Sequence, residues 1–376
     1  MKPIPFNQPG FVGRELEYIS HAVACGHISG DGSFTRKVQS QLEQDLGVHR
    51  VLLATSCTDA LEMSSLLLEL GPGDEFIVPS YTFVSTANAF ALRGARPVFV
   101  DIRPDTLNID ERLVESRIGP KTRAIVVVHY AGVGCDMEAL GEIAARHGLP
   151  LVEDNAHGLF ARLRGRLLGT FGALATLSFH ETKNFTCGEG GALIINDPAL
   201  VERAEIIRDK GTDRARFFRG QVDKYTWVGV GSSFLPSDIL AAVLLAQLEG
   251  RDRILEARRR VWLRYQTELA PWAAKRGIGL PVVPADREQS FHLFYLLMRS
   301  IEDRQSLIEH LRSRAMLAVF HYQPLHLSPM GRGFGGRPGD CPVTEDISDR
   351  LVRLPLFNWF EEADQSRVIE AVLEFG

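Results

Sequence analysis

The 376-residue sequence has few cysteines, little net charge and no long apolar segment. Its five cysteines lie far apart without a Cys-x-x-Cys pair, which indicates neither zinc nor a dithiol couple and favours a reducing compartment. The formal net charge of -5 is spread along the chain and creates no field that attracts nucleic acid or anionic membranes. No stretch approaches the roughly 18 to 20 apolar residues that cross a bilayer, and the N-terminus lacks a signal peptide's apolar core. We therefore expect a cytoplasmic protein that binds neither nucleic acid nor membrane.

Common nucleotide and hydrolase motifs are also missing. The sequence contains no Walker phosphate loop, His-Glu-x-x-His or Gly-x-Ser-x-Gly. Gly331 to Gly336 match the spacing Gly-x-Gly-x-x-Gly, but no strand pattern precedes them and no helix pattern follows. Without that context the glycines cannot cradle a dinucleotide, so a Rossmann-type oxidoreductase is disfavoured.

Short apolar runs alternate with helical patterns in the first part of the chain. Continuous apolar strands separated by helices predict an α/β fold with a mostly parallel sheet covered on both faces. Ligands of such sheets bind where the strands end. The runs are Val51–Thr55, Glu75–Val78, Pro97–Val100, Ala124–Val128 and Leu149–Glu153.

The pattern changes after about residue 235. Asp238 to Gln266 predict one long helix or two in succession, followed by a smaller mixed region. We place the domain boundary near residue 250, with a large domain at 1–250 and a small domain at 251–376. The helix carries many arginines, which we interpret as a solvated face rather than a nucleic-acid site: Arg251, Arg253, Arg258, Arg259, Arg260 and Arg264.

Lys183 and Asp154 together indicate one cofactor. Lys183 follows a strand-like run and precedes Gly188-Glu-Gly-Gly191, and Asp154 ends the strand Leu-Pro-Leu-Val-Glu-Asp. Taken singly, Lys183 could be a surface lysine, and Asp154 a helix cap or a salt-bridge partner. As a pair they suit pyridoxal phosphate (PLP), because the amine can join its aldehyde and the carboxylate can keep its ring nitrogen protonated.

Other residues at strand ends could complete that site. Ser56-Cys57-Thr58 opens a helix, where free N–H groups favour a phosphate, although an ordinary helix cap is an equal alternative. Phe83 could stack on a flat cofactor or pack in the core. His157, three residues after Asp154, could meet the ring's phenolic oxygen or be an interior histidine.

With these motifs in place, the sequence resembles the DegT and DnrJ group of nucleotide-sugar aminotransferases, which have the aspartate aminotransferase fold. This fold (type I of the PLP-dependent transferases) implies a mostly parallel, seven-stranded type of sheet and a smaller C-terminal α/β domain. Within the group, Phe218–Trp227 and the form His-Glu-Thr-Lys look most like TDP-4-keto-6-deoxyglucose 4-aminotransferases, the TDP-4-amino-4,6-dideoxygalactose transaminase type. The matching segments are Ser29–Thr35, Thr55–Leu61, Pro79–Asn88, Glu153–His157, Ser178–Gly191, Phe320–His326 and Arg353–Phe357.

The resemblance implies a role for each matching position. Lys183 would be the catalytic lysine, Asp154 would pair with the ring nitrogen, His157 with the ring oxygen, and Phe83 would stack. Cys57, Thr58 and Ser178 would hold the phosphate. Family members are homodimers, and Ser233 stands where the partner chain usually gives an asparagine to the phosphate. Sugar-nucleotide contacts are expected at Lys224, Tyr225, His321 and His326.

The implied reaction is transamination from glutamate to TDP-4-keto-6-deoxyglucose, which gives a TDP-4-amino-4,6-dideoxyhexose. A 3-aminotransferase on a related keto sugar and a PLP-binding sensor without turnover stay open as alternatives. Sugar dehydratases of the group carry histidine where this chain has Lys183, which argues against that branch. The sequence does not indicate the C4 configuration of the product.

Overall fold

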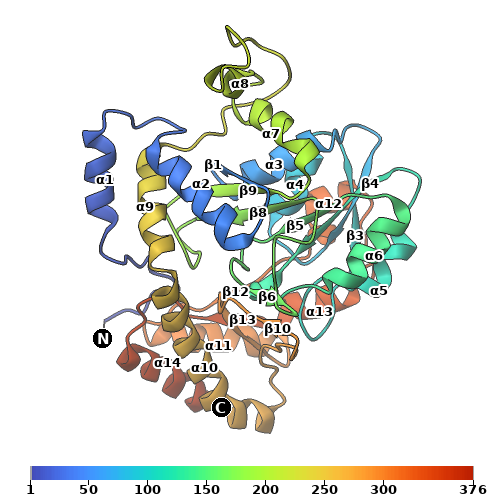
Figure 1. Ribbon diagram of the computed structural model, residues 1–376. Helices are drawn as coiled ribbons and strands as arrows, with labels where there is room; N and C mark the ends of the chain where they lie inside the picture. The colour runs from blue at the N-terminus through green and yellow to red at the C-terminus, as the bar shows by residue number, and fades with distance from the viewer. Residues whose placement is uncertain (1, 376) are drawn as a thin grey trace.

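The computed structural model describes residues 2–375 of the chain (Figure 1). A seven-stranded sheet with the strand order β1-β9-β8-β5-β4-β2-β3 forms the centre of the upper part in this view. The lower part contains the sheet β11-β13-β12 together with helices α10, α11 and α14. A third small sheet has the order β10-β6-β7.

The strands are β1 (Arg50–Ala54), β2 (Glu75–Pro79), β3 (Arg96–Val100), β4 (Thr122–Val128), β5 (Leu151–Asp154), β6 (Arg162–Leu163), β7 (Arg166–Leu167), β8 (Leu174–Ser178), β9 (Gly191–Ile195), β10 (Arg287–Glu288), β11 (Phe294–Leu297), β12 (Val319–Phe320) and β13 (Leu351–Leu354). The helices are α1 (Glu15–Ala24), α2 (Ser33–Leu46), α3 (Cys57–Leu67), α4 (Val84–Ala91), α5 (Glu111–Val114), α6 (Met137–His147), α7 (Val201–Arg208), α8 (Arg214–Phe218), α9 (Asp238–Glu249), α10 (Arg251–Arg276), α11 (Ile301–Ser313), α12 (Pro329–Gly333), α13 (Pro342–Arg350) and α14 (Glu362–Glu374). Four short 3-10 helices are η1 (Glu115–Arg117), η2 (Tyr130–Gly132), η3 (Pro198–Leu200) and η4 (Leu325–Leu327).

Successive side chains of β1 enter different layers of the large domain. Leu52 and Ala54 pack with α3, α4 and α7 on one face of the sheet. Val51 and Leu53 pack with α2 and α9 on the other face. Near β4, helices α5 and α6 cover that same face of the sheet. Full burial of each such aliphatic side chain contributes about 1.5 to 3 kcal/mol, which explains why both faces are covered. The predicted α/β sheet with helices on both faces is confirmed.

Strand β9 is the exception to the parallel arrangement. It runs antiparallel to both of its neighbours, β1 and β8. The Lys183 segment lies between β8 and β9, so the chain passes through this loop and returns directly beside the strand that it has just left. The return places Gly191 opposite Ala54, at the end of β1 from which α3 begins.

The region of the expected boundary contains two helices in succession. Helix α9 ends at Glu249 and α10 begins at Arg251, with Gly250 between them. Along α10, Ile254 still packs in the large-domain core, whereas Val261 packs in the core of the small domain. Ile4 also belongs to that second core, so the N-terminal segment crosses to the small domain.

One arginine of α10 departs from the expected solvated face. Arg258 is 1% exposed and donates to the carbonyls of Phe291 and His292 and, over 2.9 Å, to Asn358 Oδ1. A buried guanidinium needs such acceptors because an isolated charge is costly in the interior. The spacing of apolar residues along the helix could not identify which arginine would face these acceptors.

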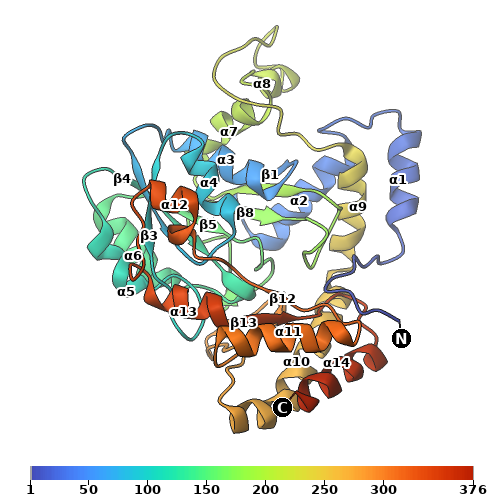
Figure 2. The ribbon, with the colours of Figure 1, turned by 180° about the vertical axis from the view of Figure 1, so that it is seen from behind.

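The glycine-rich segment at Met330–Asp340 begins within helix α12 and lies against the large domain (Figure 2). Arg96 Nη2 donates to the Phe334 carbonyl over 2.8 Å, and just before the segment the Leu325 N–H donates to the Ser80 carbonyl over 3.0 Å. The chain therefore returns from the small domain to the large one before β13. Within residues 2–375, no helix is both long and apolar enough to cross a membrane.

Candidate active site

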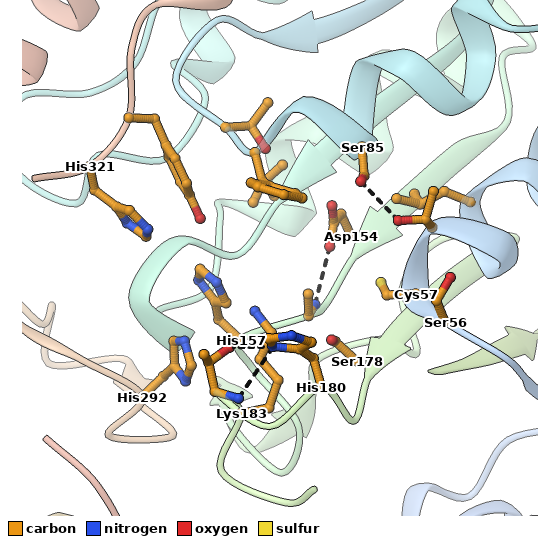
Figure 3. Close-up of a pocket in the computed structure, with 18 of the residues that line it drawn as sticks. Ser56, Cys57, Ser85, Asp154, His157, Ser178, His180, Lys183, His292 and His321 are labelled. Carbon is orange, nitrogen blue, oxygen red and sulfur yellow. Dashed lines mark hydrogen bonds between the residues drawn. The ribbon is translucent and has the colours of Figure 1, made fainter. Parts of the chain in front are cut away.

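A cavity of about 510 Å³ lies where the two domains meet (Figure 3). Its walls come from strand ends and helix starts of the large domain, from the small-domain strands β12 and β13, and from the N-terminal segment at Phe6. It gathers residues that are up to 347 positions apart, namely Phe6 and Arg353. Seven of the residues expected at the cofactor line it: Cys57, Thr58, Phe83, Asp154, His157, Ser178 and Lys183.

Asp154 ends β5 with its carboxylate buried. Thr86 Oγ1 donates to Oδ2 over 2.7 Å, and the Ala156 N–H donates to Oδ1 over 3.2 Å. Both of these donors, a hydroxyl and a backbone N–H, are uncharged. Burial raises the pKa of this carboxyl. A cationic ligand beside Asp154 would favour the ionised carboxylate and would itself be held in the protonated form.

Lys183 lies in the loop after β8, and its backbone N–H donates to the His180 carbonyl over 2.9 Å. Burial lowers the pKa of its amine to about 8. Near neutral pH a larger fraction of the amine is therefore neutral than in an ordinary lysine, and the neutral amine is the form that attacks an aldehyde and accepts a proton.

His157 has an unused hydrogen-bonding atom in the cavity wall. Its Nδ1 is buried and has no partner within residues 2–375. Its ring stacks on that of His292 at 4.2 Å between centroids, and His292 Nδ1 lies 2.9 Å from Asn184 Oδ1. Burial lowers the pKa of His157 well below its ordinary value, so the ring is neutral. Its unpartnered Nδ1 can form a hydrogen bond with a polar atom of a ligand.

The start of α3 forms the opposite end of the cavity (Figure 3). Ser56 caps the helix by accepting from the Asp59 N–H over 3.0 Å, and Thr58 Oγ1 donates to Ser85 Oγ over 2.8 Å. A side chain at Gly191 would bring its Cβ to 2.3 Å from the Ser56 carbonyl carbon, so only glycine lets β9 approach this turn. Helix N-termini with free N–H groups bind phosphates.

Phe83 stands directly before α4, and 57% of its surface is exposed. An apolar ring of this size is normally covered, and Phe83 lines the cavity. Its exposed face suits stacking on a flat ligand rather than core packing.

These groups fit PLP. The α3 N-terminus with Thr58 and Ser178 would take its phosphate, Asp154 its ring nitrogen, the free nitrogen of His157 its ring oxygen, and Lys183 its aldehyde. Bound there, the cofactor supplies an electron sink that stabilises the carbanion formed when a substrate loses a proton.

The lowered pKa of Lys183 gives a pH-dependent prediction. In cofactor-free protein, capture of PLP should accelerate with a midpoint near pH 8 and should level off about one pH unit higher, where deprotonation of the amine is largely complete. An unperturbed lysine would keep accelerating to about pH 10.4. The growth rate of the yellow absorbance between pH 6.5 and 10 measures this. A midpoint near 10 would show that burial does not lower the pKa of this amine.

The structure does not bring every expected residue to the cavity. Ser233 lies in a bridge with Asp209, and Lys224 and Tyr225 lie in the segment around α8 that projects at the top of Figure 1. None of the three lines the cavity of their own chain.

The structure corrects the expectation that His326 contacts the sugar nucleotide. Its ring is fully buried away from the cavity, with Nδ1 2.6 Å from Ser80 Oγ and Nε2 3.0 Å from Glu345 Oε1. Because both ring nitrogens already have protein partners, His326 is not placed to contact a substrate. The expected residue His321, by contrast, lines the cavity (Figure 3).

Several wall residues were not assigned from the sequence. Ser85 and Arg353 lie within segments that carried the resemblance, so their position in the sequence could have indicated that they line the site. His292 stands alone after the small-domain boundary, and no spacing connects it with His157. Only the packing of the two domains shows that relation.

Comparisons with known proteins agree with this geometry. The model of the DegT/DnrJ/EryC1/StrS aminotransferase family matches residues 12–373. The chain is 31% identical over 382 residues to the GDP-perosamine synthase of Escherichia coli O157:H7, covering 100% of this chain and 99% of that protein. It is 33% identical to S. venezuelae DesV, whose crystal structure has a TM-score of 0.90 and covers 100% of this chain and 99% of that chain.

Spr1654 from Streptococcus pneumoniae, assigned as a sugar aminotransferase, is 26% identical and covers 100% of this chain and 98% of that chain. Its structures in the PLP form and the PMP form have TM-scores of 0.91 and 0.92. The family, the cofactor states of these neighbours and the fitting cavity agree on PLP as the cofactor. The chain therefore belongs to the DegT/DnrJ/EryC1/StrS aminotransferase family and is a PLP-dependent sugar aminotransferase.

Proposed function

We propose that this enzyme moves the amino group of glutamate to the C4 ketone of a nucleotide-linked 4-keto-6-deoxy sugar. The observation that carries the proposal is the convergence of Lys183, Asp154 and His157 on one cavity that also has a helix N-terminus suited to phosphate (Figure 3). The family match supports transamination of a nucleotide sugar. We place the reaction in the cytoplasm.

Each side chain has a distinct task in this proposal. Lys183 would hold the aldehyde carbon until the donor's amine displaces it, and its freed amine would then take a proton from the carbon that carries the amino group and return it on the cofactor side. Asp154 keeps the ring nitrogen protonated through their charge pairing. His157 uses its free Nδ1 for the ring oxygen, and Phe83 covers one face of the ring.

The resemblance and the comparisons favour different nucleotides. The resemblance of Phe218–Trp227 and of the Lys183 motif favours TDP, whereas the relative of 31% identity is named for a GDP-linked product. We keep TDP-4-keto-6-deoxyglucose as the proposed acceptor and treat the GDP-linked keto sugar as the competing one. The choice between them concerns recognition of the base and of the sugar.

We also propose a homodimer. The segment around α8 projects from the body (Figure 1) and exposes large apolar side chains, with Phe218 70%, Trp227 77% and Val230 67% exposed. Exposed apolar groups gathered on one projection favour burial against another chain. In a dimer, Ser233, Lys224 and Tyr225 would then reach the partner's cavity rather than their own.

The test uses purified protein loaded with PLP and mixed with glutamate. Loss of the yellow band with release of 2-oxoglutarate, followed by amination of TDP-4-keto-6-deoxyglucose, is the expected result. NMR of the product identifies the aminated carbon and its configuration. Parallel reactions with the GDP-linked sugar decide the nucleotide, and a protein that leaves both sugars unchanged would overturn the proposal.

A further inference from the structure

His292 and Asn184 form a buried hydrogen-bonded pair beside His157. His292 lies between β10 and β11, and its ring stacks on the His157 ring with 4.2 Å between centroids and 26° between planes. His292 Nδ1 lies 2.9 Å from Oδ1 of Asn184, the residue that directly follows Lys183. One ring of the small domain thus contacts two parts of the cofactor site.

Hydrogen bonds determine which way the Asn184 amide faces. Its Nδ2 donates to the Ser290 carbonyl over 2.7 Å, and a carbonyl can only accept. The amide oxygen therefore faces His292, so His292 Nδ1 is the donor and carries a proton. Burial lowers the pKa of His292 well below its ordinary value, so the ring is neutral. Asn184 thereby selects one orientation and one tautomer of this imidazole.

The backbone around His292 is held as firmly as its ring. Ser290 Oγ donates to the His157 carbonyl, which ties this segment to the residue whose ring His292 covers. Arg258 donates to the carbonyls of Phe291 and His292. These donors come from both sides of the segment, so its position relative to His157 is fixed.

Phe291, between Ser290 and His292, has a strained backbone. Its φ of 55° lies in the left-handed region, which a bulky side chain rarely adopts. Such a conformation persists only where surrounding contacts hold it, and strained residues cluster at functional sites. Here the hydrogen bonds of the flanking residues hold it, and the His292 ring lies in the cavity wall.

The His157 ring depends on packing for its direction. Nδ1 is buried and has no partner in the part of the chain that the structure describes. Without a hydrogen bond at this atom, contacts on the ring must select among its side-chain rotamers. The stacked His292 ring supplies one such contact, and Tyr130 supplies another, edge-on at 6.0 Å between centroids.

We propose that His292, oriented by Asn184, is a positioning residue that holds the His157 ring in the direction needed to donate to the ring oxygen of PLP. This inference deepens the proposed function and rests on the task assigned there to His157. A donor directed at that oxygen stabilises its anionic form. A His157 ring without the stack would be correctly directed for only part of the time, so the contact would weaken.

A cycle of the variants His157→Ala, His292→Ala and their combination tests the inference by the affinity of cofactor-stripped protein for PLP. His157→Ala should weaken binding at least about tenfold, because one hydrogen bond to a charged oxygen is lost. His292→Ala should weaken binding about three- to tenfold when His157 is present. In the His157→Ala background it should weaken binding less than about twofold, because residues that act through one contact are not additive.

The pH at which the absorbance of the bound cofactor titrates is a second readout of the same contact. Loss of the donor destabilises the anionic ring oxygen, so this pH should rise in both single variants and rise no further in the double variant. Equal losses of affinity from His292→Ala in both backgrounds would overturn the inference and leave His292 a purely structural role. No loss from His157→Ala would show instead that the proposed task of His157 is wrong, and the inference with it.

His310→Ala is the matched control. His310 is another small-domain histidine, with Nε2 2.8 Å from the Ala371 carbonyl and outside the cavity wall. Its loss should leave both the PLP affinity and the titration pH unchanged. A change as large as that of His292→Ala would mean that any weakening of the small domain disturbs the cofactor, which contradicts a specific role of His292.

His292→Phe is the second variant, in case the alanine variant does not fold. Phenylalanine keeps a flat ring but cannot donate to Asn184, so PLP binding should weaken less than with alanine, and again only when His157 is present. In unaltered protein labelled with ¹⁵N-histidine, the NMR signal that disappears in either variant should be that of a neutral ring with its proton on Nδ1. A His292 proton on Nε2 would contradict the bond to Asn184 and overturn the inference.

Discussion

Replacing Lys183 with alanine should abolish turnover and remove the yellow absorbance of the lysine-linked cofactor. The variant loses both the amine that holds the aldehyde and the base that moves the proton. Proton transfer by a positioned side chain alone contributes about 10²- to 10⁴-fold, so we expect a loss of at least about 10⁴-fold when both functions disappear. Absorbance spectra and single-turnover rates with glutamate and with the keto sugar measure the two losses separately.

Lys210→Ala is the matched control, because Lys210 has a 56% exposed side chain that pairs with Asp209. It should keep both the absorbance and the turnover. Added small amines should partly restore proton transfer in Lys183→Ala, since the cavity left by the side chain can admit them. A Lys183→Ala protein that keeps the yellow band and full turnover would show that another group performs this chemistry.

Replacing Asp154 with asparagine should lower turnover by about 10³-fold while the protein still folds. Asparagine has nearly the same shape but no charge, so the ring nitrogen would lose its anionic partner and its proton. Breaking a buried charge pair costs about 3 to 5 kcal/mol, which corresponds to roughly 10²- to 10³-fold or more in rate. The measurements are the rate of the glutamate half-reaction and the position of the cofactor absorbance.

Thr86→Val separates charge from hydrogen bonding at Asp154. Thr86 Oγ1 donates to Oδ2 over 2.7 Å, so this variant keeps the carboxylate and removes one neutral donor. We expect a loss below about tenfold, consistent with one ordinary hydrogen bond. If Asp154→Asn were no worse than Thr86→Val, the carboxylate would not act through its charge, and pairing with the ring nitrogen would be wrong.

The sequence predicted more of the large domain than of the small one. The runs at β1, β2, β4 and β5 are continuous and apolar because these strands are covered on both faces. That pattern is strong enough to predict a mostly parallel sheet. The antiparallel return of β9 left no such signal, because Gly191–Ile195 is an apolar run that suits either direction.

The cofactor residues could be predicted because they follow from local sequence. Asp154 ends a strand, and Ser56 to Thr58 open a helix at the end of another, so the sheet itself brings them to one edge. His326 was mispredicted for the same reason that His292 was missed. A single histidine carries no indication of which polar groups surround it, and Ser80 and Glu345 are distant in sequence.

The sequence by itself determined the chemistry of this protein: a lysine, a strand-end carboxylate and a helix start whose types and order resemble one aminotransferase family. The tertiary structure alone decided which isolated side chains share the cavity, since Phe6 and His292 come from segments that local patterns do not connect with the cofactor residues. The physical reason is that hydrophobic periodicity records which face of an element is buried. It does not record which distant element covers that face, and the packing of the small domain against the large one settles this.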